Sequence, residues 1–205
     1  MNTLYTIGHS NHRLDKFLDL LTQHNINAVC DVRSYPYSKY NPQFNHPQLR
    51  EKLSEINIAY VFLGKELGGR TSDINCYRQG KVQYDLVAKT TLFNDGMQRL
   101  QTGVKSYYVA LMCAEKDPLN CHRLLLICRH LQVDDLTIQH IDADGNLENQ
   151  KAVEQRLLAK LKLENLELAY EKQSQKTAYV NDKIGENNAE SLYNRLYQKN
   201  CPDIF

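Results

Sequence analysis

Cysteine, histidine, acidic and arginine side chains gather in one short segment of the chain. Residues 113–123 read Cys-Ala-Glu-Lys-Asp-Pro-Leu-Asn-Cys-His-Arg. A cysteine at the end of a strand or the start of a helix is a candidate nucleophile, because the positive end of the helix dipole lowers its pKa. Carboxylate and imidazole groups can move protons, and an arginine near a helix N-terminus can bind an anion. We therefore predict catalytic roles for Cys113, Glu115, Cys121 and His122, and a substrate contact for Arg123.

An alternative is that this region binds a metal ion, with Cys113, Cys121 and His122 as ligands and His9 as an optional fourth. The spacing does not provide two short-spaced cysteine knuckles. Neighbouring Cys121 and His122 would also point in different directions on a helix. We therefore assign no metal ligand and no cofactor from the sequence. A redox role for the thiols is also open, although the chain contains no Cys-x-x-Cys.

A purely structural interpretation of the same residues is also open. Cys121 and Cys128 are seven residues apart, which places them on one face of a helix, where cysteines often serve as small buried apolar side chains. Arg123 could form a structural ion pair with Glu115 or Asp31.

Other polar residues follow the predicted strands. Gly-His-Ser-Asn follows a strand at residues 4–7, Asp-Val-Arg-Ser ends a strand at 28–32, and the segment 64–70 follows a strand at 59–63. The carboxyl ends of parallel strands share one edge of a sheet, where open α/β folds bind ligands, so we expect one shared site. These residues add His9 as a candidate catalytic residue. They also add a set of substrate-binding candidates: Ser10, Asn11, Asp31, Arg33, Ser34 and Arg70.

Strands and helices alternate along the chain. Strands at 4–7, 28–32, 59–63, 107–112 and 136–141 alternate with segments of helical apolar spacing, interrupted by an irregular excursion at 71–83. We predict a helix that opens at Pro118 and continues through Leu131. The alternation predicts an α/β fold with a mostly parallel sheet of about five strands and flanking helices. We place the α/β domain at 1–145 and a helical, polar C-terminal extension, packed on the same domain, at 146–205.

The composition narrows the class of protein. The chain has 205 residues, of which 42% are hydrophobic and 24% charged, with a formal net charge of +1. A net charge this small provides no global field for nucleic acid or acidic lipid, so any anion binding must be local. No window approaches the roughly 20 apolar residues of a membrane span. With six cysteines and no signal peptide, we expect a cytoplasmic protein with reduced thiols and no membrane partner.

Basic and aromatic residues alternate in the loop between Arg33 and Phe44, a pattern that can stack bases and hold phosphates. Together with the edge site, this loop leads to one leading hypothesis about function and two alternatives. The first is an enzyme acting on a phosphate-bearing small molecule, such as a nucleotide, or on a nucleic-acid base. The alternatives are a nucleic-acid-binding module without catalysis and a Cys/His metal-binding protein.

Several ordered motifs resemble one family. They are Thr-Ile-Gly-His-Ser-Asn at 6–11, Asp-Val-Arg-Ser at 31–34, Asn-Pro-Gln-Phe at 41–44, Leu-Gly-Gly-Arg at 67–70, Cys-Ala-Glu-Lys-Asp-Pro at 113–118 and Cys-His-Arg at 121–123. The chain, to about residue 179, is similar to the uncharacterised domain of unknown function 488 (DUF488) family. The resemblance implies a compact Rossmann-like α/β domain with the motif residues gathered in one cleft. It implies no particular reaction.

Overall fold

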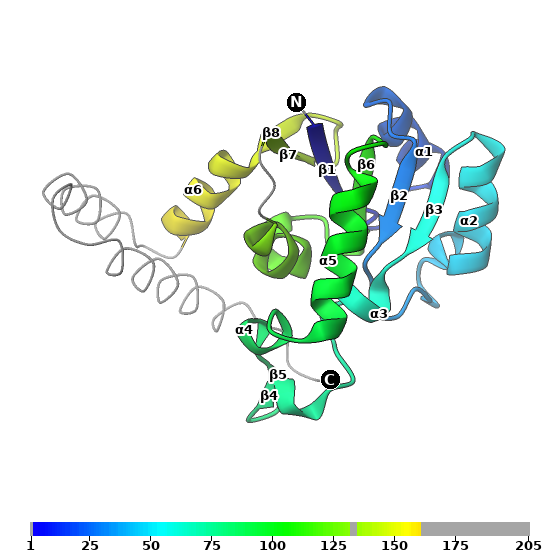
Figure 1. The fold of residues 1–205 in the computed structure, drawn as a ribbon. Helices are drawn as coiled ribbons and strands as arrows, with labels where there is room; N and C mark the ends of the chain where they lie inside the picture. The colour runs from blue at the N-terminus through cyan, green and yellow to red at the C-terminus, as the bar shows by residue number, and fades with distance from the viewer. Residues whose placement is uncertain (1, 132–134, 161–205) are drawn as a thin grey trace, which may run out of the picture.

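The computed structural model describes residues 2–131 and 135–160, which form a central sheet covered on both faces (Figure 1). The sheet has six strands in the order β3-β2-β6-β1-β7-β8. Their bounds are β1 (Asn2–Gly8), β2 (Ala28–Asp31), β3 (Ala59–Phe62), β6 (Val109–Cys113), β7 (Leu136–Ile141) and β8 (Leu147–Asn149). Four of the five pairings along this order are parallel, and the fifth, between β7 and β8, is antiparallel. The predicted α/β fold with a mostly parallel sheet is confirmed, and it is consistent with a Rossmann-like arrangement.

Two sets of helices cover the two faces of the sheet. Helices α1 (Leu14–Gln23) and α2 (His46–Glu55) pack on one face, and α5 (Thr91–Gly103) and the π-helix η4 (Arg123–Cys128) pack on the other. The apolar residues of α1 recur at helical spacing, so Phe17, Leu20 and Leu21 are all buried on one side. Side chains of β6 alternate between the two cores, and all five of its residues are buried. This central position holds the end of β6 firmly in place.

Short elements complete the described fold. They are η1 (Pro42–Phe44), α3 (Gly64–Leu67), η2 (Ile74–Cys76), β4 (Tyr77–Arg78), β5 (Lys81–Val82), α4 (Tyr84–Val87) and η3 (Pro118–Asn120). The expected irregular excursion at 71–83 contains η2 and the small hairpin of β4 and β5.

The helix expected from Pro118 to Leu131 is divided into two pieces. Asp117 caps the short turn η3 by accepting a hydrogen bond from the backbone N–H of Leu119, as its position before Pro118 suggests. Cys121 then has an extended backbone, with φ −129° and ψ 139°, before the chain turns into η4. Cys121 therefore precedes the helix, and the expectation that it shares a helix face with Cys128 is wrong.

The segment after residue 145 adds to the same sheet. β8 pairs with the edge strand β7, and helix α6 (Gln150–Lys160) packs against β7, β8 and η3 with Val153 and Leu157 buried. The domain boundary at 145 stays a prediction, and residues 161–205 of the expected extension lie outside the described residues. Within the described ranges, none of the helices is both long and apolar enough to cross a membrane.

Candidate functional site

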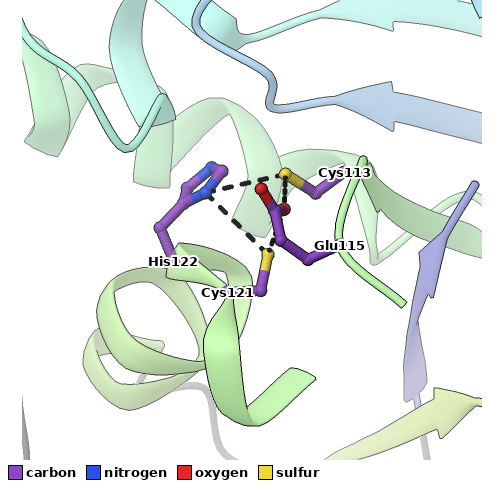
Figure 2. A group of neighbouring side chains, drawn as sticks. All are labelled: Cys113, Glu115, Cys121 and His122. Carbon is purple, nitrogen blue, oxygen red and sulfur yellow. Dashed lines mark hydrogen bonds between the residues drawn. The ribbon is translucent and has the colours of Figure 1, made fainter. Parts of the chain in front are cut away.

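Four reactive side chains meet at the carboxyl edge of the sheet (Figure 2). Cys113 is the last residue of β6, Glu115 lies on the loop that follows, and Cys121 and His122 lie just before η4. The thiols of Cys113 and Cys121 both donate to the same carboxylate oxygen of Glu115, at 2.8 and 3.1 Å. Their sulfur atoms lie 3.7 and 3.9 Å from Nδ1 of His122. The structure thus brings together four of the five predicted catalytic residues.

The loop that carries Cys113 and Glu115 is tied to the loop after β1. The backbone N–H of His9 donates to the carbonyl oxygen of Cys113, and that of Ser10 donates to Ala114, both at 2.9 Å. Gly8 allows this close approach, because a Cβ at that position would lie 1.8 Å from the carbonyl oxygen of Glu115. The backbone at the site is therefore fixed by strand β1.

The side chain of Arg123 holds the same loop through hydrogen bonds to its backbone. Its side chain is fully buried, and it donates to the carbonyl oxygens of Glu115 at 2.6 Å and Lys116 at 3.0 Å. The anticipated ion pair with the carboxylate of Glu115 or Asp31 is not what the structure shows, because the guanidinium faces backbone carbonyls instead. Arg123 thus positions the loop and does not line the pocket expected to take substrate.

The imidazole of His122 has a defined orientation. Its Nε2 lies 2.9 Å from the carbonyl oxygen of Val32, which can only accept, so Nε2 carries a proton and donates it. Nδ1 therefore faces the two sulfur atoms (Figure 2). The helix that follows is a π-helix, a rare form that is frequently found at functional sites.

The charges around the cluster shift the pKa values of the two thiols in opposite directions. Burial, the Cys121 thiol and the carboxylate of Glu115 raise the pKa of Cys113 well above its ordinary value. Burial would also raise the pKa of Cys121, but the adjoining Cys113 thiol, Arg123 and His122 outweigh it and lower that pKa well below its usual range. Although burial acts against its charge, contact with Cys121 and Glu115 raises the pKa of His122. Of the two thiols, Cys121 is therefore the one that loses its proton more easily, and a cysteine beside a histidine is suited to nucleophilic chemistry.

A pocket of about 240 Å³ opens onto this cluster. Its lining includes Cys113, Glu115 and His122 of the cluster together with Arg33, Ser34 and Arg70. Arg70 is exposed and its backbone N–H donates to Ser34 Oγ at 2.9 Å. Its guanidinium makes no hydrogen bond or ion pair with the described part of the chain, which leaves it available to an anion.

Arg33 is less available than Arg70. Its Nε and Nη2 donate to the fully buried carboxylate of Asp31 at 2.9 and 2.6 Å, and Nη1 lies 3.2 Å from Nε2 of His9. Because Nδ1 of His9 bonds the carbonyl oxygen of Ser10, His9 accepts from Arg33 as a neutral ring. Burial and the positive charge of Arg33 lower the pKa of His9 to about 4. The side chain of His9 belongs neither to the four-residue cluster nor to the pocket lining, so it is separate from the other predicted catalytic residues.

Only some of the predicted substrate-binding residues line the pocket. Arg33, Ser34 and Arg70 line the pocket, whereas Ser10, Asn11, Asp31 and Arg123 do not. The pocket also uses residues to which the sequence analysis gave no role: Tyr84, Asn120 and Leu125. A larger open groove of about 720 Å³ along α2 contains Arg50 beside Glu51 and Glu55, and it lacks the reactive cluster.

The comparisons with known proteins match one family. A family model described as "Domain of unknown function DUF488" matches residues 13–129, more than half of the chain and the whole of the four-residue cluster. No curated protein and no solved structure matches the chain.

Proposed function

The chain belongs to the DUF488 family, whose function is unknown, and we propose that it is an enzyme acting on a phosphate-bearing substrate, such as a nucleotide. The observation that carries this proposal is the pocket between Arg70 and the cluster of Cys113, Glu115 and His122. The pocket lining combines the guanidinium of Arg70, which has no partner among the described residues and suits an anionic group, with groups that can attack a substrate or move its protons.

The size of the pocket limits what enters it. Its volume of about 240 Å³ lies below the roughly 300–1,000 Å³ typical of sites that enclose a whole drug-sized ligand. A nucleotide would therefore place one end in the pocket and leave the other outside. Tyr35, which lines the pocket and is 75% exposed, provides a ring at the entrance on which a base could stack.

The roles of the cluster follow from its contacts. In the metal-free cluster, Cys121 is the thiol whose pKa is lowered and whose sulfur adjoins the imidazole of His122, so we assign it as the nucleophile, although Cys113 is the thiol that lines the pocket. Glu115 faces the pocket and can exchange a proton with the substrate. Arg70 holds the phosphate.

Binding tests the substrate class. We would titrate the protein with AMP, GMP, CMP and UMP, with the matching nucleosides, and with inorganic phosphate by isothermal calorimetry. We expect nucleotides to bind, nucleosides to bind more weakly, and R70A to weaken nucleotide binding about tenfold, which corresponds to about 1.4 kcal/mol. R50A removes an exposed arginine from the groove along α2 and serves as the matched control.

Turnover of bound nucleotides, followed by chromatography and ³¹P NMR, tests the catalytic part. We expect C121S to abolish turnover while nucleotide binding persists. Absence of nucleotide binding at millimolar concentrations, or binding that R70A leaves unchanged, would overturn the proposed substrate class.

A second candidate, binding of single-stranded nucleic acid without catalysis, is favoured by one observation. Tyr35, Tyr37 and Tyr40 of one loop are 75%, 46% and 94% exposed. Exposed rings of this kind can stack bases. Salt titrations with labelled single- and double-stranded oligonucleotides test this candidate, and it requires binding that weakens with salt and is lost in a Y35A/Y40A variant. No binding at low salt would eliminate it.

A further inference from the structure

The spacing of the buried ligand atoms matches that of a tetrahedral metal site. In such a site, zinc–sulfur bonds of about 2.3 Å and zinc–nitrogen bonds of about 2.0–2.1 Å place a sulfur and a nitrogen ligand about 3.6 Å apart. Nδ1 of His122 lies 3.7 Å from the sulfur of Cys113 and 3.9 Å from that of Cys121. All four candidate ligand atoms, including one of Glu115, lie within 4.8 Å of one another. An ion between these atoms would therefore require little rearrangement.

The second nitrogen of His122 is held as metal-bound histidines usually are. Ligating histidines almost always donate the other ring N–H to a carboxylate, a backbone carbonyl or water, which fixes the tautomer and the ring orientation. Nε2 of His122 donates to the carbonyl oxygen of Val32 at 2.9 Å. Nδ1, whose lone pair an ion would use, faces the two sulfur atoms (Figure 2).

The local backbone allows the side chains of neighbouring Cys121 and His122 to converge. On a helix, adjacent side chains diverge by about 100°. Cys121 instead has an extended backbone, whereas His122 begins the helical turn with φ −62° and ψ −20°. This change of conformation between adjacent residues directs both side chains toward Cys113, as Figure 2 shows.

The fourth position differs from the other three because it faces the pocket. Cys113, Cys121 and His122 are buried, whereas Glu115 is exposed. Its carboxylate oxygen lies 2.8 and 3.1 Å from the two sulfurs, so to serve as a ligand it would have to withdraw by about 0.5 to 0.8 Å to the tetrahedral spacing. The alternative is that a water or a substrate atom takes the fourth position. Three protein ligands and a replaceable fourth is the arrangement of catalytic zinc sites.

We propose that Cys113, Cys121 and His122 bind one zinc ion, with the fourth position open to the pocket beside Glu115. Two thiolates and an imidazole in a tetrahedral arrangement favour zinc over magnesium or calcium, which prefer oxygen ligands. Both thiols give up their protons to solvent when the ion binds. This inference does not depend on the identity of the substrate.

Metal content and cobalt substitution test the inference on the full chain. We would purify the protein in reductant without chelator, measure its metal content by mass spectrometry, remove the metal and titrate the reduced apoprotein with Zn²⁺ and Co²⁺. We expect one zinc per chain and a Co²⁺ complex with thiolate charge-transfer bands and the intense visible bands of tetrahedral coordination. A reduced wild-type protein that binds neither ion at micromolar concentration would overturn the proposal.

Substitutions identify the ligands. Loss of an outer-shell partner of a zinc ligand typically costs about 10–100-fold in affinity, and we expect C113S, C121S and H122A to lose at least that much. C128A is the matched control, because Cys128 is a buried cysteine of the adjoining helix outside the cluster. Zinc affinity that is unchanged in all three ligand variants would contradict the assignment, and a variant that fails to fold leaves the wild-type cobalt spectrum as the deciding measurement.

Two further variants separate this inference from the proposed function. We expect R70A to keep its zinc whatever happens to nucleotide binding. We expect E115Q to keep the stoichiometry of one, because three ligands remain. If E115Q binds no zinc, the site is closed by Glu115 and its fourth position is not open. Zinc binding without nucleotide binding would overturn the substrate class alone, and the reverse result would overturn the metal site alone.

Discussion

The imidazole of His122 is hydrogen-bonded through Nε2 to the carbonyl oxygen of Val32, 2.9 Å away. Val32 follows directly after β2, and its own N–H donates to the carbonyl oxygen of Met112 in β6 at 3.0 Å. Cys113 is the next residue along β6. The ring of His122 and the sulfur of Cys113 are therefore positioned by the same pair of hydrogen-bonded strand ends.

Gly69 tests how closely the ring must be held. A Cβ at this position would lie 2.9 Å from Cγ of His122 and 3.0 Å from the hydroxyl of Tyr84. Because the ring is held by Val32 on its other side, we expect G69A to displace it and to weaken zinc binding about tenfold or more, as loss of an orienting contact does. Competition with a chromophoric chelator measures this affinity.

Gly103 provides the control. A Cβ there would have Val109 as its nearest neighbour at 4.0 Å, which is an ordinary contact. We expect G103A to leave zinc affinity unchanged and to raise the free energy of unfolding by roughly 0.4–1 kcal/mol. Equal affinities for G69A and wild type would show that the ring tolerates displacement.

Arg123 is predicted to stabilise the loop that carries Glu115. Replacing it in R123M removes two charged hydrogen bonds and leaves the carbonyl oxygens of Glu115 and Lys116 without those donors. At roughly 1.5–3 kcal/mol for each such bond, we expect the free energy of unfolding to fall by about 3 kcal/mol or more in urea titrations. R99M removes a half-exposed ion pair with Glu66 and is expected to cost about 1 kcal/mol or less. Similar losses in the two variants would contradict a structural role for Arg123.

Much of the fold was predictable because buried parallel strands are short apolar runs. The strand predicted at 136–141 matches β7, and the other four parallel strands differ from their predictions only at the ends. Strand β8 was not predicted, since Leu147–Asn149 is short and has one apolar residue of three, and it is specified by pairing with β7. Periodicity cannot indicate such an edge strand.

The edge that carries the site and the four residues of the cluster were predictable, but the geometry that brings them together was not. Polar residues after parallel strands indicated where Cys113 and Arg70 would lie. The extended backbone of Cys121 was not predictable, because apolar spacing continues through it and masks the break between η3 and η4. The carbonyl of Val32 leaves no signal at all, since every residue has one. For these reasons the sequence favoured helical geometry at Cys121 and His122, and with it no metal ligand.

We predict that replacing the buried acid Asp31 strongly destabilises the fold. Its carboxylate accepts from Arg33 and from the hydroxyl of Tyr60 at 2.7 Å, and none of it is exposed. Although burial opposes the charge of Arg33, the contacts with Asp31 outweigh it and raise the pKa of Arg33. D31N would leave that cation buried without a counter-charge, so we expect a loss of about 3–5 kcal/mol in the free energy of unfolding. D15N, which breaks the exposed pair of Asp15 with Arg13, should have a far smaller effect, and equal losses would contradict the prediction.

His140, which lies outside the four-residue cluster, gives the protein a pH-dependent stability. Its Nδ1 accepts from the hydroxyl of Thr6 at 2.8 Å and its Nε2 donates to Oε1 of Gln150 at 2.9 Å, so the neutral ring has both partners satisfied. Burial, opposed by the bond to Gln150 and aided by Arg123 and Arg156, lowers its pKa to about 4 from 6.5. Because the folded chain then binds this proton less readily than the unfolded chain, stability falls as the pH drops from 6.5 toward 4. The full loss for one such histidine is about 3 kcal/mol.

Urea unfolding of wild type and H140Q between pH 8 and pH 4.5 measures this effect. Glutamine keeps a side-chain amide that can donate to Gln150 but does not titrate. We expect the wild-type free energy of unfolding to fall more steeply than that of H140Q below pH 6.5, while the two curves run parallel above pH 7. His9, whose pKa is also lowered to about 4, contributes the same trend to both proteins and therefore cancels in the comparison. Parallel curves across the whole range would mean that His140 becomes protonated in the folded chain as easily as in the unfolded one.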